Sequence, residues 1–388
     1  MIAAGSGLAA SPSPESATLD ACLEALGKSG RDHADVALVF ATGEALDRAH
    51  ELLHVVRRVT GARVVVGCSG TGVLTERGEI EGRPAVAVLT VSGEALVAPP
   101  VLVESHGEIA SAAGSDLAER IAGTVAEGGC VVVLPDPSGL EPRAMLGALG
   151  DALGFLPVVG AVAAGTPFFE LVNTDAACGA LAGLALSGVS PIIGVAQGCV
   201  PIGAPYVITR AEGNVVHEIG SRPAVEILAE AIRSLENPED RIRRAGIFAG
   251  LAIDPAKSPL ERGDFLVRNL LGVDRSSGAV ALGEPVHPGQ TIQFQIRDAL
   301  ASREDLRSTL QGVAEKLAGR PPRFGCYFNC AGRGEGLFGI PDHDVTLIRE
   351  RLGDFPLVGF FGNGEFAPIG RRNFFHTYTG ALVVFPER

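Results

Sequence analysis

The chain has 388 residues, 46% hydrophobic and 20% charged, so it can bury a core and does not have the composition of a disordered chain. Its 32 Lys and Arg residues against 45 Asp and Glu give a net charge of −13, which argues against nucleic acid and anionic membranes as partners. The seven cysteines are irregularly spaced and form no CxxC pair, which indicates reduced thiols and a cytoplasmic location.

Three stretches of the sequence repeat one order of predicted elements: a strand, a helix, a strand and a further strand. A hexamer with glycine at both ends follows the third element each time, at residues 67–72, 160–165 and 359–364. In chain order, the predicted elements are Val36–Phe40, Glu44–Thr60, Arg63–Val66 and Ala85–Val91; Val131–Leu134, Glu141–Leu153, Val158–Val159 and Ala180–Leu186; and Phe324–Asn329, His343–Leu352, Leu357–Val358 and Gly380–Phe385. This β-α-β-β order predicts an α+β fold, with mixed β-sheets and helices packed on them.

A fourth stretch reads mainly as strands, and the chain divides beside it. Its predicted strands are Ala245–Ile253, Asp264–Leu270, Ala279–Leu282 and Thr291–Arg297, and helices are expected at Pro223–Leu235 and Ser302–Leu317. A meander ends at Gly220, and Pro223 then suits the first turn of a helix. We therefore expect an N-terminal extension at 1–30 and domains at 31–220 and 221–388.

Two patterns that suggest other classes of protein are rejected. Residues 176–209 carry no charge, but glycines and prolines interrupt them, so two buried strands explain the run better than a membrane span. His50 and His54 match the zinc-binding pattern H-E-x-x-H. On the predicted helix they share a face with Arg57 and Arg58, which repel a metal ion, so we expect an exposed helix face and no metal site.

Cys68 and Ser69 lie in the first glycine hexamer, between a strand and a loop. Backbone N–H groups and a hydroxyl at such a corner can bind polar atoms of a ligand. The alternative is a structural corner without a ligand. The hexamer lacks the lysine of a phosphate-binding loop, and Thr71 breaks the G-x-S-x-G pattern of a nucleophile elbow.

The C-terminal third holds the sharpest local pattern. Cys330 ends a predicted strand and is followed by glycines and Arg333, whose charge would favour a thiolate. Asn363 and Glu365 end the next strand and would reach the same edge of the sheet. His376 precedes the last strand. For Cys330 and His376, the alternative is a buried structural side chain.

Polar residues also interrupt the apolar meander. Gln197 and Cys199 belong to the stretch Gln197–Gly203, and Asn214 follows Gly213. Buried polar side chains need partners, so Gln197 and Asn214 are candidates either to bind a ligand or to hold a hairpin.

Taken together and in this order, the motifs resemble the FIST family, whose name stands for F-box and intracellular signal transduction. The resemblance covers roughly residues 30–385, with an N-terminal and a C-terminal FIST portion. It implies a bacterial sensory module that binds a small ligand such as an amino acid. The ligand-binding residues would be Cys68, Ser69, Gln197, Cys199, Asn214, Cys330, Arg333, Asn363, Glu365 and His376. Any output would come through a separate signalling protein.

Three hypotheses of function follow. The first is a ligand-binding sensor in which Glu365 pairs with the ammonium of an amino acid, and Arg333 or the glycine corners bind its carboxylate. The second is an enzyme with Cys330 as nucleophile and His376 as its partner. The third is a scaffold that docks another protein. No cofactor or metal is expected in any of them.

Overall fold

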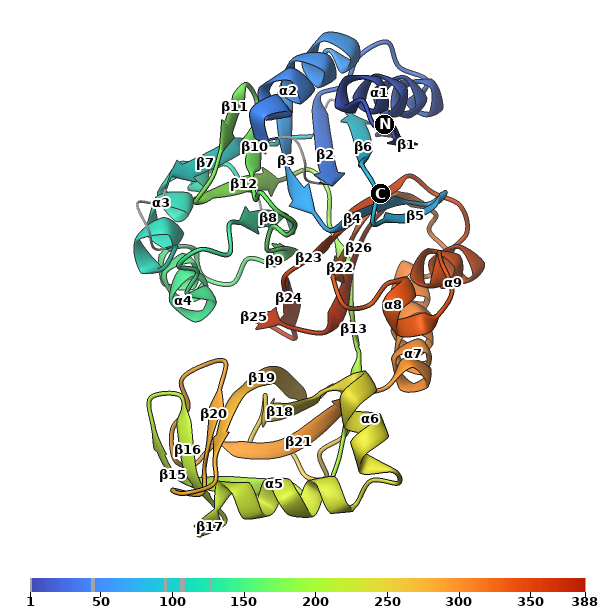
Figure 1. The fold of residues 1–388 in the computed structure, drawn as a ribbon. Coiled ribbons are helices and arrows are strands. Elements are labelled where there is room, and N and C mark those ends of the chain that lie inside the picture. The colour runs from blue at the N-terminus through green and yellow to red at the C-terminus, as the bar shows by residue number, and fades with distance from the viewer. Residues whose placement is uncertain (1, 43–45, 94–95, 105–108, 126–127, 388) are drawn as a thin grey trace. The chain divides into compact units, whose positions relative to one another are not determined.

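The computed structural model describes the chain except for residues 1, 43–45, 94–95, 105–108, 126–127 and 388. Its residues form two compact units (Figure 1). Unit 1 comprises residues 1–195, 306–375 and 379–388, and unit 2 comprises residues 196–305 and 376–378. None of the helices, within the described part of the chain, is long and apolar enough to cross a membrane.

Unit 1 repeats one arrangement three times along the chain. Each copy has an outer strand, a helix, a central strand, a helical segment, a strand that leads into the glycine hexamer, a hairpin and a closing strand. The first copy consists of β1 (Ala3–Ala10), α1 (Pro14–Ser29), β2 (Val36–Thr42), α2 (Leu46–Thr60), β3 (Val64–Gly70), β4 (Gly72–Thr75), β5 (Gly78–Glu81) and β6 (Ala85–Ser92).

The other two copies keep this order. The second consists of β7 (Pro100–Glu104), α3 (Ser111–Ile121), β8 (Cys130–Pro135), α4 (Pro142–Leu153), β9 (Val158–Ala161), β10 (Glu170–Val172), β11 (Asp175–Ala177) and β12 (Ala180–Leu186). The third consists of β13 (Ile192–Gln197), α7 (Ala299–Leu317), β22 (Pro322–Cys330), α8 (Glu335–Phe338), α9 (His343–Leu352), β23 (Leu357–Gly362), β24 (Glu365–Ile369), β25 (Arg372–His376) and β26 (Thr379–Pro386).

Each copy supplies four neighbouring strands of one six-stranded sheet, and the hairpins, which form the other two strands of each sheet, are exchanged in a cycle. The strand orders are β1-β6-β2-β3-β10-β11, β25-β24-β9-β8-β12-β7 and β13-β26-β22-β23-β4-β5. The hairpin of the first copy therefore joins the third sheet, that of the second joins the first sheet, and that of the third joins the second sheet. This exchange ties the three copies into one unit.

The inner faces of the three sheets share one apolar core. Phe40 of the first sheet packs on Phe360 of the third with ring centroids 4.7 Å apart, and Leu134 of the second belongs to the same buried cluster. Side chains one position away along the strands point outward instead. In Figure 1, α1 and α2 cover the first sheet and α3 and α4 the second. The α+β prediction is confirmed.

The first glycine of each hexamer is required by the neighbouring strand. An added Cβ would lie 1.8 Å from the carbonyl oxygen of Val39 at Gly67, 1.9 Å from that of Val133 at Gly160, and 1.8 Å from that of Tyr327 at Gly359. Backbone atoms cannot yield to such an overlap, so only glycine fits. The repeated glycine therefore marks close approach of two parallel strands.

The structure adds elements that the sequence analysis did not predict. The first 30 residues, treated above as an extension, contribute β1, which pairs with β6 along its whole length, and α1, which packs on the same sheet. Residues 73–81, for which no helix or strand is predicted above, form most of the hairpin β4–β5. The predicted first helix is observed from Leu46 onward, and residues 44 and 45 lie outside the described residues.

Unit 2 lies in the sequence between β13 and most of α7 of the third copy. It contains β14 (Cys199–Pro201), β15 (Tyr206–Glu212), β16 (Val215–Ile219), β17 (Arg222–Pro223), α5 (Ala224–Arg233), α6 (Pro238–Ala245), β18 (Ile247–Ala252), β19 (Phe265–Asp274), β20 (Ala279–Leu282) and β21 (Thr291–Arg297). The strands form an eight-stranded sheet, and apolar side chains of α5 pack on it. The predicted strands of the fourth stretch are confirmed.

Candidate functional site

The three glycine hexamers of unit 1 are hydrogen-bonded to one another. Each bond joins a backbone amide to a backbone carbonyl: Ala164 N–H to Ser69 (3.0 Å), Thr71 N–H to Phe361 (3.1 Å), Asn363 N–H to Val162 (3.0 Å) and Val162 N–H to Gly364 (2.9 Å). These bonds place the carboxyl ends of β3, β9 and β23 around one closed ring. Many of the corner amides expected to meet a ligand are thus used within the protein.

Cys68 and Ser69 have structural partners in this ring. The Ser69 hydroxyl accepts a hydrogen bond from the Phe169 amide at 3.1 Å, and both residues are fully buried. Burial and the nearby Glu170 raise the pKa of the Cys68 thiol well above its ordinary value. The side-chain amide of Asn363 donates to the carbonyl of Ala163 at 3.3 Å.

Arg333 lies in a buried polar cluster at the end of β22, which we call the Arg333 cluster. Its members are Tyr327, Asn329, Arg333, His343 and Asp344, each at most 5% exposed. Arg333 donates from Nε to Asp344 Oδ2 at 3.1 Å and from Nη2 to Oδ1 at 3.4 Å. Asp344 also accepts from the Tyr327 hydroxyl at 2.7 Å and the Asn329 side-chain amide at 3.3 Å.

The surroundings of the Arg333 cluster shift the pKa values of two carboxyls in opposite directions. Burial opposes ionisation of Asp344, but the charge of Arg333 and the hydrogen bonds hold its pKa below the ordinary value. Glu79 of β5 lies beside the cluster, and its pKa is shifted in the other direction. Burial and the negative charge of Asp344 raise the pKa of Glu79, although the Val345 amide donates to its carboxyl at 3.0 Å.

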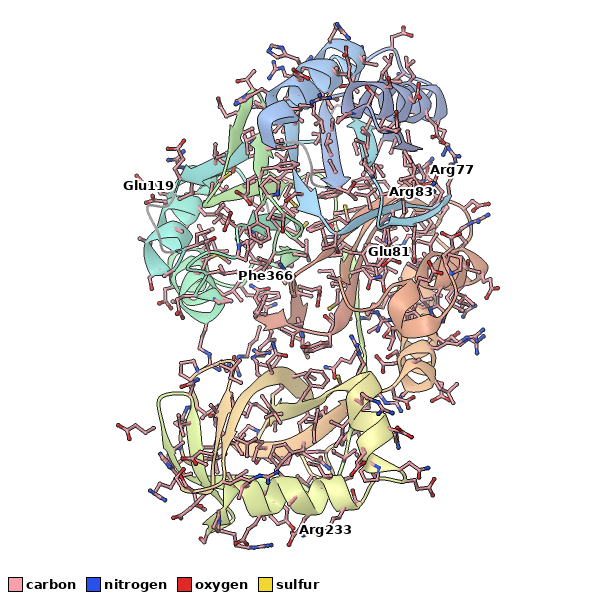
Figure 2. The ribbon with its side chains drawn as sticks, viewed as in Figure 1. Arg77, Glu81, Arg83, Glu119, Arg233 and Phe366 are labelled. Atoms are coloured by element: carbon pink, nitrogen blue, oxygen red, sulfur yellow. The ribbon has the colours of Figure 1, made fainter. Side chains whose placement is uncertain are left out.

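The β4–β5 hairpin reaches this cluster from the first copy. The Glu79 amide donates to Asp342, and the Glu81 carboxylate accepts from the Glu335 amide at 2.9 Å at the start of α8. Figure 2 labels Glu81 at this hairpin. The exchanged hairpin therefore completes the surroundings of the cluster, with residues about 260 positions away in sequence.

Glu365 is buried completely at the start of β24. Its Oε2 accepts from the Thr379 hydroxyl at 2.6 Å and the Thr379 amide at 3.3 Å. Burial raises the pKa of Glu365 to about 8, and the Thr379 bonds and the charge of Arg333 only partly offset that effect. That Glu365 and Arg333 act at one edge of the sheets stays a prediction, and the effect of Arg333 on the pKa of Glu365 supports it.

Several buried polar atoms here have no hydrogen-bond partner among the described residues. They are Arg333 Nη1, Glu365 Oε1, Asn329 Oδ1 and His343 Nε2. A buried polar atom without a partner costs free energy, so a group of them marks a place where a ligand could supply the missing bonds. The set holds one guanidinium donor and one carboxyl oxygen, which suit a ligand with both an acidic and a basic group.

Four of the expected ligand-binding residues belong to unit 2. The Gln197 side-chain amide donates to the carbonyl of Phe265 at 2.9 Å, and that of Asn214 to Leu282 at 2.8 Å. Cys199 is buried with Phe248 and Val267, and His376 is 1% exposed. Cys330, 8% exposed at the end of β22, and His376 thus fall in different units.

The two histidines of the H-E-x-x-H pattern lie on an exposed face of their helix, as predicted. His50 and His54 are exposed on α2, and a ring nitrogen of His50 lies 3.3 Å from the carbonyl oxygen of Thr174. In the part of the chain that the structure describes, no three His, Cys, Asp or Glu side chains are placed to hold a metal ion.

Sequence reasoning missed most of the Arg333 cluster. Asp344 was read only as part of a helix, yet it is the carboxylate that four side chains contact. Its signal in the sequence is weak, because an acidic residue in the first turn of a helix is common on protein surfaces. Glu170, discussed below, was missed because its strand has three residues.

Comparisons with known proteins agree with the resemblance found above. The FIST N domain matches residues 35–222 and the FIST C domain residues 224–368. An uncharacterized protein of Mycobacterium tuberculosis is 33% identical over 393 residues, covering 99% of both chains. An uncharacterized protein of Mycobacterium bovis is 33% identical over 389 residues, covering 99% of this chain and 98% of its own.

A solved structure shows a weaker likeness. A cyanuric acid hydrolase from A. caulinodans covers 100% of both chains, with a TM-score of 0.40 and 9% identity. Similarity at this level carries no conclusion about the chain. The family divides the sequence near residue 223, whereas the compact units divide it at residues 195 and 305.

Proposed function

This chain belongs to the FIST family, whose domains are sensory modules of signal transduction, and from that membership we propose that unit 1 binds a zwitterionic small molecule of the amino acid type. Arg333 would bind the carboxylate and Glu365 the ammonium group. The signal would pass to a separate protein. The domain division at 31–220 and 221–388 remains part of this proposal.

One observation carries the proposal. Arg333 Nη1 and Glu365 Oε1 are buried and lack partners among the described residues, and the charge of Arg333 lowers the pKa of the Glu365 carboxyl. A structural ion pair would direct these atoms at each other. An amino acid offers an acceptor to one and a donor to the other, and charge-assisted bonds of this kind are strong.

The surroundings suit a ligand that binds without being changed. Asp344 already holds Nε and Nη2 of Arg333, which fixes the direction of the remaining Nη1. Thr379 likewise holds one oxygen of Glu365 and leaves the other. Both side chains are 0% exposed, so a ligand can reach them only if the covering segments rearrange. Such a rearrangement is what a sensory module needs.

The test is a thermal-shift screen of the full chain with the amino acids, followed by calorimetric titration of any hit. A ligand at 100 times its dissociation constant stabilises the folded state by about 2.7 kcal/mol. Glu365→Gln keeps the shape of the side chain and the Thr379 contact but removes the carboxylate that would form when an ammonium group binds. We expect it to weaken binding at least about tenfold, since a charge-assisted bond is lost.

The matched control is Glu170→Gln, which changes an equally buried glutamate at the equivalent position of another repeat. It should bind the amino acid as the unchanged protein does. Arg333→Ala is a poor test by itself, because it leaves Asp344 buried without its cation and destabilises the fold. Absence of binding by every amino acid, or equal binding by Glu365→Gln, would contradict the proposal.

A further inference from the structure

The second copy in unit 1 carries a buried carboxyl that the proposed amino acid site does not use. Glu170 begins β10 and is paired in register with Cys68, the second residue of its hexamer. Glu365 begins β24 and is paired with Ala161, the second residue of the next hexamer. The internal repeat therefore places the two glutamates at equivalent positions on neighbouring sheets.

The side chain of Glu170 points toward the shared core. Residues two apart on a strand share a face, and Val172 on the same strand belongs to the inner apolar cluster with Cys68. Glu170 is 0% exposed, and neither of its carboxyl oxygens has a partner in hydrogen-bond geometry among the described residues, although the Ala180 amide is close enough to lower its pKa. Native proteins rarely leave a whole carboxyl group in this condition.

The neighbours of Glu170 differ from those of Glu365. Arg333 is the cation that lowers the pKa of Glu365. The charged group with the largest effect on the pKa of Glu170 is instead Asp136, which directly follows β8. Asp136 is 2% exposed and is fixed by the backbone, accepting from the amides of Ser138 at 2.6 Å and Gly179 at 2.9 Å. The pair thus presents acceptors and no cation.

Titratable groups from three other segments interact electrostatically with this carboxyl. Burial and the charge of Asp136 raise the pKa of Glu170 to about 9, and the Ala180 amide partly offsets this. The thiols of Cys68 and Cys178 are also held above their ordinary pKa, in part by Glu170. Cys178 is exposed, so one side of this group lies close to the surface.

We propose that Glu170 and Asp136 form a second binding site in unit 1, which takes the ammonium group of a small amine that lacks a carboxylate. An ammonium brings three N–H donors to carboxyl oxygens that need them. No arginine is among the groups that shift the pKa of Glu170, and the two acidic side chains favour an ammonium over a carboxylate. A metal ion fits less well, because the described residues provide no third ligand.

Binding at this site is coupled to proton release. At neutral pH the Glu170 carboxyl keeps its proton. When an alkylammonium binds, its N–H donates to the carboxylate, and the displaced carboxyl proton passes to solvent. One proton is therefore released for each ammonium bound. An alkylammonium itself stays charged over this range, as the lysine side chain does. Affinity should then rise about tenfold per pH unit below the pKa of Glu170.

The experiment is a calorimetric titration of the full chain with methylammonium chloride, against sodium chloride at equal ionic strength. It is repeated in two buffers of different ionisation enthalpy, which counts the protons released. We expect binding of methylammonium and not of sodium, release of about one proton, and a dissociation constant about tenfold lower for each unit from about pH 6.5 to about pH 8.5.

Variants separate this site from the amino acid site. Glu170→Gln should abolish methylammonium binding, and Glu365→Gln should leave methylammonium binding unchanged. Amino acid binding should show the reverse pattern, so either site can fail without the other. If Glu170→Gln does not fold, two other measurements test the site. Asp136→Asn should weaken methylammonium binding, and the unchanged protein should release about one proton for each methylammonium bound. The proposal would be overturned by equal binding of sodium, by methylammonium binding without proton release, or by loss of methylammonium binding in Glu365→Gln alone.

Discussion

At the scale of single residues, the functional expectations divide by what each side chain contacts. Ser69 and Asn214 bond to the backbone, which satisfies their polar groups without a ligand. Arg333 and Glu365 keep polar atoms without partners after all their contacts within the described residues are counted. The candidate ligand-binding residues thus play different parts, and the difference lies in which of their hydrogen bonds the fold leaves unmade.

The reactivity of Cys330 tests the alternative of a nucleophilic cysteine. Cys178 is exposed, whereas Cys330 is 8% exposed at the end of β22. Since alkylation requires access to a thiolate, iodoacetamide should modify Cys178 first and Cys330 much more slowly. The measurement is peptide mass spectrometry over time, with Cys178→Ser as the control. Preferential modification of Cys330 would favour an enzyme over a sensor.

At the scale of elements, each hexamer turns a buried strand toward the centre of unit 1. The strand that leads into each hexamer runs parallel to the central strand beside it, and the first glycine lets the two backbones meet. A hairpin then leaves for the neighbouring sheet. The polar groups proposed for ligand binding lie at these corners because the strand ends of all three sheets converge there.

Gly67→Ala tests this account of the hexamer. Its Cβ would lie 1.8 Å from the Val39 carbonyl oxygen, so the parallel strands must separate. We expect destabilisation of at least about 3 kcal/mol, measured by urea unfolding followed by circular dichroism. Gly27→Ala in α1 is the control, since its Cβ would meet nothing within 4 Å. It should stabilise the protein by up to about 1 kcal/mol, and equal effects of the two changes would contradict the account.

At the scale of the whole molecule, unit 2 is an insertion within the third copy of the repeat. The two ends of the insertion lie together, because the Gln197 amide donates to Asp305 at 2.6 Å. On the unit 1 side, the Thr309 hydroxyl donates to the Val195 carbonyl at 3.2 Å. A chain can bridge so short a gap with a small loop, so unit 1 does not depend on unit 2 for its connectivity.

Replacing residues 198–304 by a short glycine–serine loop tests that independence. The shortened protein should remain folded with one cooperative thermal transition, because the three sheets and their hairpin exchange are complete within unit 1. Circular dichroism and thermal unfolding measure the outcome. As a control, removing β4 and β5 instead should prevent folding, since that hairpin completes the third sheet. Loss of folding on removal of residues 198–304 would show that the units are not independent.

Residue patterns alone predict the glycines of the hexamers, the family and, within each repeat, the central helices and strands. Each of these is set by periodicity or by a residue type over a few positions. The hairpin exchange, the contact of Arg333 with Asp344, and the equivalence of Glu170 with Glu365 become visible only in the folded chain. These depend on strand pairing and burial between segments far apart in the chain, which local residue patterns do not encode.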